Sequence, residues 1–205
     1  LLQTLNILEN FNIKSLGHNS AAAIHYLSES MIRAFADRAE YHGDPDFYEV
    51  PVTNLLSKEY SKKSSKSIEE NLKTPPELIF AGNFKRSDES PDTTHLSVVD
   101  ADGNAVSLTY TLGSSFGSGV TVEKGGFLLN NQMRNFSHYY GDQKAEYGTS
   151  AANRLESGKR MISTQAPTMV FDPEGNLHMI LGSPGGGRIP NILSQVISNI
   201  VDHDL

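Results

Sequence analysis

The chain has 205 residues, a formal net charge of −7 and no cysteine. This length suits one domain or a closely joined pair, and the lack of cysteine excludes disulfides, thiolate metal sites and cysteine nucleophiles. Because 24 acidic residues face 17 basic ones, we expect no nucleic-acid partner and no binding to an anionic membrane. No apolar run approaches the ~18 residues of a membrane span. The first residues show neither an initiator methionine nor a signal-peptide pattern, so we expect a piece of a larger protein.

The first 72 residues have the pattern of three helices. An apolar stripe runs over residues 1–11. A second helix is expected from its cap Ser20 to about Tyr41, ended by the break at 43–46. A third, more polar helix is expected over 55–72, with its lysines as a solvated face rather than a binding patch. The apolar face of the second helix is expected to consist of Ala23, Leu27, Met31, Ala34 and Phe35.

Residues 73–92 are polar and contain several breakers, so we interpret them as a linker or an exposed loop. After them the pattern changes to a period of two. A last helix is expected from about Ile189 to Val201. Strands are expected over 95–100, 105–111, 127–130, 166–172 and 177–182, with turns at 100–104 and 172–176. This order predicts an α+β fold, a mainly antiparallel sheet with helices packed on it.

Thr93, Thr94 and His95 stand where the linker meets the first expected strand. A neutral hydroxyl needs a base, and a threonine at a new N-terminus can use its own α-amine, with an ordinary pKa of about 7.7–8.0. That chemistry requires cleavage of the preceding peptide bond, for which an exposed linker is a suitable place. Alternatively, Thr93 and Thr94 simply begin a strand, and the pair by itself favours this alternative.

Three further segments contain groups suited to binding or catalysis. The run 183–188 places three glycines between a strand and a helix, where backbone N–H groups converge on an anion or form a flexible turn. Asn130, Asn131 and Gln132 place amides at a strand end, either for binding or for a hydrogen-bonded turn. Residues 159–164 bring two cations and two hydroxyls ahead of the next strand.

In this order, these segments resemble the gamma-glutamyltranspeptidase family of N-terminal-nucleophile hydrolases. The resemblance covers the whole chain and implies an αββα sandwich, incomplete here. Residues 1–92 would form the C-terminal part of the large subunit, and residues 93–205 the N-terminal part of the small subunit. An earlier segment with an arginine for the substrate α-carboxylate would lie outside the chain, as would the last strands of the sheet. The matching segments are 43–47, 93–100, 102–107, 128–133, 159–160, 166–168 and 182–188.

The resemblance also implies a mechanism. Thr93 would attack the carbonyl of Asp92, cut the chain at that bond, and then attack a γ-glutamyl amide with its freed amine as the base. The γ-glutamyl enzyme would pass its acyl group to water, an amino acid or a peptide. Thr111 would contact the amine of the nucleophile, and Gly185 and Gly186 would supply the backbone donors of an oxyanion hole.

Substrate contacts are implied in the same way. Ser163 and Thr164 match a hydroxyl pair near the substrate α-carboxylate, with threonine at a position where serine is usual. Gln132 matches a residue near the α-amino group, and Asn135 stands where typical members have an aspartate that pairs with the α-ammonium. Tyr147 lies in a segment that resembles a lid over the glutamyl site, although an ordinary surface loop fits that segment equally well.

Two departures from the family pattern concern the substrate. Asn135 keeps a hydrogen-bond acceptor without the charge, and Gly113 replaces an expected asparagine, so both changes weaken recognition of a free α-amine. An uncharged residue at 135 resembles members that cleave poly-γ-glutamate or glutaryl amides.

Three functions therefore remain open. We favour a self-processing γ-glutamyl transferase or hydrolase that acts on glutathione-like donors. The alternatives are the same chemistry on poly-γ-glutamate or a glutaryl (cephalosporin) amide, and an uncleaved, non-catalytic paralogue. The expected partners are a γ-glutamyl substrate, an acceptor and the rest of the large and small subunits. We expect no cofactor and no catalytic metal and, from the resemblance only, a periplasmic or extracellular location.

Overall fold

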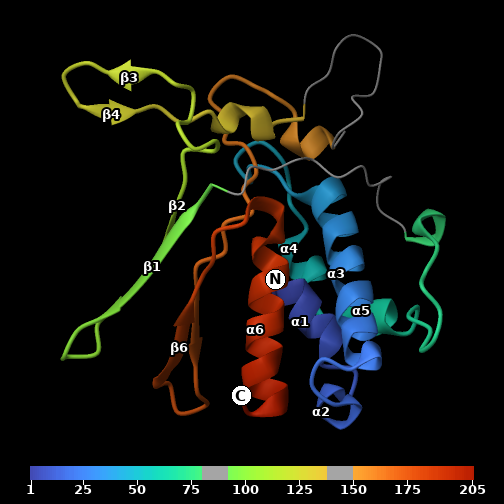
Figure 1. Ribbon diagram of the computed structural model, residues 1–205. Helices are drawn as coiled ribbons and strands as arrows, with labels where there is room; N and C mark the ends of the chain where they lie inside the picture. The colour runs from blue at the N-terminus through green and yellow to red at the C-terminus, as the bar shows by residue number, and fades with distance from the viewer. Residues whose placement is uncertain (80–91, 138–149) are drawn as a thin grey trace. The chain divides into compact units, whose positions relative to one another are not determined.

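The computed structural model describes residues 1–79, 92–137 and 150–205 (Figure 1). The chain divides into two compact units. Unit 1 combines Leu1–Ser87, Phe136–Ile162 and Ser194–Leu205, and unit 2 combines Asp88–Asn135 and Ser163–Leu193. Among the described residues, no helix is long and apolar enough to cross a membrane.

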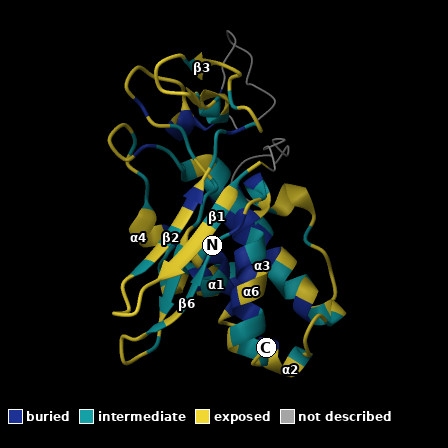
Figure 2. Ribbon diagram, turned by 60° about the vertical axis from the view of Figure 1, so that its left-hand side comes forward, coloured by how far each residue is buried: buried dark blue, intermediate teal, exposed yellow. Residues whose placement is uncertain are grey.

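Unit 1 is helical, and its central element is α3 (Ala21–Tyr41). Helices α1 (Leu2–Leu8), α2 (Ile13–Leu16) and α5 (Lys58–Ser65) pack against α3, and α4 (Val52–Leu55) contacts α5. The turns η1 (Pro76–Leu78) and η3 (Ala151–Asn153) and most of α6 (Ile189–His203) complete the unit. Figure 2 shows the buried stripe along α3. The core residues of this unit include Ile7, Leu8, Ile13, Met31, Ala34, Ala36, Leu55 and Ile197.

The sequence correctly predicts the ends of α3. The Ser20 hydroxyl accepts a hydrogen bond from the backbone N–H of Ala23 at 3.1 Å, which satisfies one of the free donors of the first turn. The helix ends at Tyr41, and His42 has an extended backbone conformation. The predicted apolar face is only partly right, because Leu27 and Phe35 are half-buried while the charged side chains Glu29, Arg33 and Asp37 are buried. Apolar periodicity cannot reveal charged residues whose partners lie in other segments.

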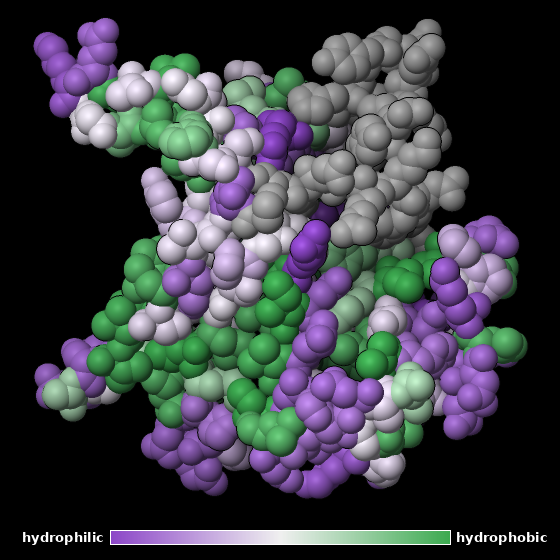
Figure 3. Space-filling model, in the orientation of Figure 1, coloured by the Kyte–Doolittle hydropathy of each residue, from purple (hydrophilic) through white to green (hydrophobic). Residues whose placement is uncertain are grey.

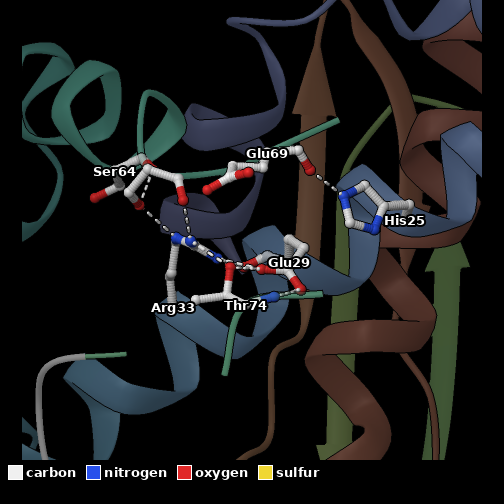
Figure 4. A network of polar contacts seen from close by, with 7 residues as sticks. His25, Glu29, Arg33, Ser64, Glu69 and Thr74 are labelled. Atoms are coloured by element: carbon white, nitrogen blue, oxygen red, sulfur yellow. Dashed lines mark hydrogen bonds and ion pairs between the residues drawn. The ribbon is translucent and has the colours of Figure 1, made fainter. Parts of the chain in front are cut away.

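Glu29 and Arg33 of α3 form a buried network with the segment that follows α5 (Figure 4). Arg33 donates to Glu29 Oε2 at 2.6 Å, to Ser67 Oγ at 2.9 Å and to Thr74 Oγ1 at 3.0 Å. Thr74 donates its N–H and its hydroxyl to Glu29, at 3.1 and 2.6 Å. Burial opposes ionisation, but the hydrogen bonds from Thr74 and Arg33 keep the pKa of Glu29 below its ordinary value. The helix expected over 55–72 ends earlier, with α5 at Ser65, and this network holds the chain beyond it.

Unit 2 consists of three antiparallel hairpins. Strand β1 (Thr94–Val99) pairs with β2 (Ala105–Tyr110), β3 (Thr121–Val122) with β4 (Phe127–Leu128), and β5 (Thr168–Phe171) with β6 (Leu177–Leu181). The first and third pairs lie where the sequence predicts them. Strand β4 is shorter than expected, and its partner β3 is not predicted. The α+β class is confirmed, although the described residues form three two-stranded sheets rather than one continuous sheet.

The turns of the first and third hairpins use the same chemistry. Asp100 accepts hydrogen bonds from the backbone N–H of Asp102 and Asn104, at 2.9 and 2.8 Å. Asp172 accepts in the same way from Asn176, at 2.7 Å. The side-chain amides of Asn104 and Asn176 each donate to the other carboxylate oxygen, and these bonds lower the pKa of both aspartates.

One face of the β1–β2 hairpin is apolar and exposed. The register sets Leu96 opposite Leu108 and Val98 opposite Val106. These side chains are 44 %, 46 %, 53 % and 52 % exposed, respectively. Figure 3 shows the hydrophobic surface along this hairpin. An apolar patch of this kind is typical of a surface that packs against another segment or partner.

Candidate active site

The predicted nucleophile lies at the open end of the β1–β2 hairpin. Thr93 directly precedes β1 and is half-buried, while Thr111 directly follows β2. Because Thr94 pairs with Tyr110, Thr93 and Thr111 occupy the next facing positions. The structure therefore brings together the two threonines that the sequence assigns to one site.

The Thr111 hydroxyl lies on the predicted scissile peptide. Its Oγ1 accepts a hydrogen bond from the backbone N–H of Gly113 at 3.0 Å and donates to the carbonyl oxygen of Asp92 at 2.8 Å. A hydroxyl has a single proton, and the N–H of Gly113 occupies one of its acceptor positions. The proton of Thr111 therefore points at the oxygen of the Asp92 carbonyl group, whose carbon Thr93 would attack.

Ser115 holds the side chain of the residue before the nucleophile. Its hydroxyl donates to Asp92 Oδ2 at 2.7 Å, so the side chain and the carbonyl of Asp92 are both bound by the turn after β2. Sequence reasoning missed Ser115. The available signal was a pair of hydroxyl residues, Ser114 and Ser115, closely following Thr111.

Gly113 is required where the turn after β2 meets Asn131. Its φ is +93°, and a Cβ at this position would overlap Asn131 Oδ1. That oxygen accepts from the N–H of Ser114 at 3.0 Å, and Asn131 Nδ2 donates to Ser114 Oγ at 2.9 Å. Gly113, which replaces an asparagine expected from the family pattern, thus leaves room for the side-chain amide of Asn131.

The turn η2 (Gln132–Asn135) brings two predicted substrate residues together. Asn135 Nδ2 donates to Gln132 Oε1 at 3.0 Å, and both residues are half-buried. The preceding N–H, of Asn131, donates to the carbonyl oxygen of Leu112 at 2.9 Å, next to Thr111. Gln132 and Asn135 therefore lie on a segment that is bonded to the turn carrying Thr111.

The charged group on this segment is a cation. Arg134 Nη1 donates to Ser114 Oγ at 3.2 Å, and residues 111–122 and 125–137 contain no aspartate or glutamate. A positive charge repels an ammonium group and attracts a carboxylate. Sequence reasoning missed Arg134, although it stands directly before Asn135.

Gly185 and Gly186 both have a positive φ, which few residues other than glycine adopt. Their φ angles are +131° and +54°, a region that favours glycine, and Gly186 begins the turn η4 (Gly186–Arg188) ahead of α6. Within the described part of the chain, neither backbone N–H of this pair makes a hydrogen bond with the protein. Both donors are therefore available to an anionic oxygen.

The end of β6 lies against β1. A Cβ on Gly182 would overlap the ring of His95, and Ser107 of β2 donates to the carbonyl oxygen of Leu181 at 3.3 Å. The ring nitrogens of His95 contact Thr109 Oγ1 at 2.9 Å and Ser97 Oγ at 3.0 Å. The glycine-rich run thus begins beside the strand that follows Thr93.

The remaining predicted site residues are Ser163, Thr164 and Tyr147. Ser163 is exposed, and within the described residues it hydrogen-bonds the N–H of Gln165 at 3.2 Å rather than the amides of Gln132 or Asn135. Thr164 lies in the same irregular segment. Tyr147 falls outside the described residues. Across residues 1–79, 92–137 and 150–205, no group of three or more His, Asp or Glu is placed to hold a metal ion.

The chain is similar to known proteins over its whole length. The profile of the family described as Gamma-glutamyltranspeptidase matches residues 1–205. The chain is 43 % identical over 207 residues to the glutathione hydrolase proenzyme of Escherichia coli (strain K12), covering 100 % of this chain and 35 % of the relative. It is 45 % identical over 209 residues to the glutathione hydrolase proenzyme of Pseudomonas aeruginosa, covering 100 % and 36 %.

A solved structure matches as well. The cephalosporin acylase from Bacillus halodurans superposes with a TM-score of 0.67 at 27 % identity, over 99 % of this chain and 34 % of that chain. The chain thus spans about a third of the length of the proteins that it matches. The family profile covers every residue, and two relatives exceed 40 % identity over the whole chain. The chain belongs to the gamma-glutamyltranspeptidase family.

Proposed function

We propose that this chain is part of a self-processing γ-glutamyl transferase or hydrolase that cleaves glutathione-like donors. The observation that carries the proposal is the hydrogen bond from Thr111 to the carbonyl oxygen of Asp92, directly before Thr93. The relatives named glutathione hydrolase proenzyme support both the donor class and a precursor form. Export to the periplasm or the cell exterior is part of the same proposal.

The first reaction cuts the chain. Thr93 Oγ attacks the carbonyl carbon of Asp92, the carbon–nitrogen bond breaks, and the hydroxyl proton passes to the released amine. The resulting ester is hydrolysed by water, which leaves a carboxylate on Asp92 and a free amine on Thr93. Thr111 donates to the oxygen on which negative charge develops during the attack.

The second reaction uses the freed amine as a base. This amine accepts the proton of Thr93 Oγ as the oxygen attacks the γ-carbonyl carbon of the donor, and the leaving amine takes that proton as the amide bond breaks. The N–H groups of Gly185 and Gly186 bind the oxyanion. Water or an acceptor amine then attacks the γ-glutamyl ester and restores the Thr93 hydroxyl.

Substitution of Thr93 in the full-length precursor tests this function. Thr93→Ala removes the oxygen used in both reactions, so we expect an uncut chain and no release of p-nitroaniline from γ-glutamyl-p-nitroanilide. Thr93→Ser keeps a hydroxyl and retains both activities at lower rates. Thr94→Ala is the matched control, because Thr94 is an exposed neighbour that begins β1. Cleavage before residue 93 in the alanine variant would refute the proposal.

A specific observation favours a second donor class. The segment that carries Gln132 and Asn135 presents Arg134 and no carboxylate, so it offers no ion pair to the α-ammonium of a γ-glutamyl group. A glutaryl amide lacks that ammonium, and the residues of poly-γ-glutamate carry amides in its place. The similarity to a structure named cephalosporin acylase is in line with a glutaryl-type donor.

The donor class is tested with Asn135→Asp in the full-length protein. The new carboxylate sits beside Gln132 and forms a charge-assisted bond with an ammonium, so kcat/KM for γ-glutamyl-p-nitroanilide rises about tenfold relative to glutaryl-p-nitroanilide. The wild-type ratio of the two rates identifies the preferred class. An unchanged ratio in the variant would show that residue 135 does not read the α-substituent.

A further inference from the structure

Ser163 and Thr164 lie in a segment that has no secondary structure of its own. Residues 159–167 belong to no helix or strand. Such a segment lacks a ladder of backbone hydrogen bonds, so its position depends on side chains that bind its N–H and C=O groups. The side chains that bind the backbone of this segment therefore contribute to the placement of the two hydroxyls.

Two buried side chains from other segments bind the backbone just before Ser163. Asp44 Oδ2 accepts from the N–H of Arg160 at 2.8 Å, and Asn153 Oδ1 accepts from the N–H of Ile162 at 3.1 Å. Asp44 and Asn153 are 4 % and 3 % exposed. Alternate N–H groups of the segment are thus fixed by rigid, buried acceptors.

Asp44 also binds the side chain of Arg160. Its Oδ2 accepts from Arg160 Nε at 3.0 Å and its Oδ1 from Nη2 at 2.5 Å, so the carboxylate meets the guanidinium through two parallel bonds. Asp46 adds an exposed contact to Nη2 at 2.6 Å. Hydrogen bonds from Arg160 hold the pKa of Asp44 far below its usual range, so this contact is charged throughout the working pH range.

The whole 43–47 motif, Gly43-Asp44-Pro45-Asp46-Phe47, fits the segment 150–160. A Cβ on Gly43 would overlap the carbonyl oxygen of Ala152, so this position has room only for glycine. The ammonium of Lys159 lies 5.7 Å from the centre of the Phe47 ring and pairs with Glu156 at 3.0 Å. Gly43, Asp44 and Phe47 therefore each make a defined contact with residues 150–160.

These contacts connect the two sides of the predicted cleavage bond within unit 1. The 43–47 motif precedes Asp92, whereas residues 150–162 follow Thr93. After cleavage, Asp44 and Arg160 would belong to different polypeptides and hold them together without a covalent link.

We propose that Asp44 is a positioning residue which, by binding the backbone and side chain of Arg160, holds the segment that leads into Ser163 and Thr164 and thereby controls substrate binding. The proposal rests on the proposed function, in which these hydroxyls bind the substrate carboxylate. Asp44 touches neither the substrate nor Thr93. Its loss therefore affects KM rather than self-cleavage or kcat.

Asp44→Asn in the full-length protein tests this role. The amide keeps the size of the side chain but cannot accept two parallel bonds from the guanidinium. KM for γ-glutamyl-p-nitroanilide rises about tenfold because displaced binding groups lose contact with the substrate, while kcat and self-cleavage remain close to wild type. Asp204→Asn is the matched control, since it breaks an exposed ion pair with Lys14 at 2.5 Å in the same unit.

Two further measurements separate positioning from general stability. The first measurement is a double-mutant cycle with Asp44→Asn and Arg160→Gln. If Asp44 acts through the side chain of Arg160, the free-energy change calculated from KM for the double variant differs from the sum of those for the two single variants. Hydrogen exchange at the N–H of Arg160 becomes faster in Asp44→Asn and stays unchanged in Asp204→Asn.

The outcomes distinguish this proposal from the proposed function. If the wild-type enzyme is active and Asp44→Asn leaves its KM unchanged, the positioning role is overturned. It is also overturned if kcat falls by the same factor as KM rises and the unfolding temperature is lower. If the wild type has no turnover, the proposed function fails. The exchange rate then decides the contact alone: faster exchange in Asp44→Asn supports it, and unchanged exchange overturns it.

Discussion

The pKa values of two buried aspartates of unit 1 are shifted in opposite directions, because their partners differ in charge. Asp44 faces the guanidinium of Arg160, which lowers its pKa. Asp37 is 3 % exposed, and among the described residues it receives hydrogen bonds only from the neutral groups of Gln3 and Tyr60. Desolvation outweighs these bonds and raises the pKa of Asp37. The charge of a buried carboxylate thus depends on a compensating cation more than on the number of its hydrogen bonds.

Asp37 therefore makes stability depend on pH. Because its folded-state pKa is raised, the folded state binds a proton more tightly than the unfolded state, and the stability from Asp37 decreases as pH rises from the ordinary value of about 3.9 through the raised one. Asp37→Asn removes the charge. Its Oδ1 still accepts from the Tyr60 hydroxyl, and its Nδ2 donates to the Gln3 amide oxygen once that amide is turned over. We expect its unfolding temperature to rise by about 1–3 °C at neutral pH.

Thermal unfolding of the full-length protein across this pH range measures the effect. The difference between Asp37→Asn and wild type disappears below the ordinary carboxyl pKa, where both side chains are neutral. Asp204→Asn serves as a control of opposite sign, because Lys14 lowers the pKa of Asp204. A lower unfolding temperature for Asp37→Asn at neutral pH would contradict the argument.

At the scale of elements, the cap of α3 is a local device with a measurable contribution. Ser20 Oγ satisfies the N–H of Ala23, and Ser20→Ala leaves this donor to water at a cost of about 1 kcal/mol in the free energy of unfolding. Ser28→Ala is the matched control, since Ser28 is exposed in the middle of the same helix and alanine is the better helix former there. Urea unfolding compares the two variants, and equal midpoints would show that the cap contributes nothing.

Elements with local causes are the ones that the sequence predicts. The Ser20 cap and the Asp100 and Asp172 turns each depend on residues within four positions, and α3 and two hairpins lie where these signals place them. Strand β3 has two residues, which are too few for a period of two to show. The chain beyond α5 is held by Arg33, 34 positions before Ser67, and periodicity does not report such a contact.

The same distinction applies to the site. The sequence points to Thr93, Thr111 and the glycine pair through a resemblance in which residue type and order suffice. Ser115, Arg134 and Asp44 stayed hidden or unassigned because their roles depend on contacts across the fold. Ser115 reaches back 23 positions to Asp92, and Asp44 reaches forward 116 positions to Arg160.

At the scale of the whole molecule, the predicted cleavage bond does not coincide with the boundary between the two compact units. Unit 1 combines residues before Asp92 with residues after Thr93, and α6 contributes to both units. The Ser150 hydroxyl donates to the carbonyl oxygen of Glu40, and Lys14 pairs with Asp204. A cut at this bond therefore leaves two polypeptides that share one helical unit.

The central claim is that Thr93 becomes an N-terminal nucleophile. The most direct measurement is the intact mass of the purified full-length precursor after incubation, with the N-terminal sequence of each product. We predict two polypeptides, the second beginning at Thr93. A single uncut chain whose fold is shown to be intact would contradict the account and favour a non-catalytic binding protein.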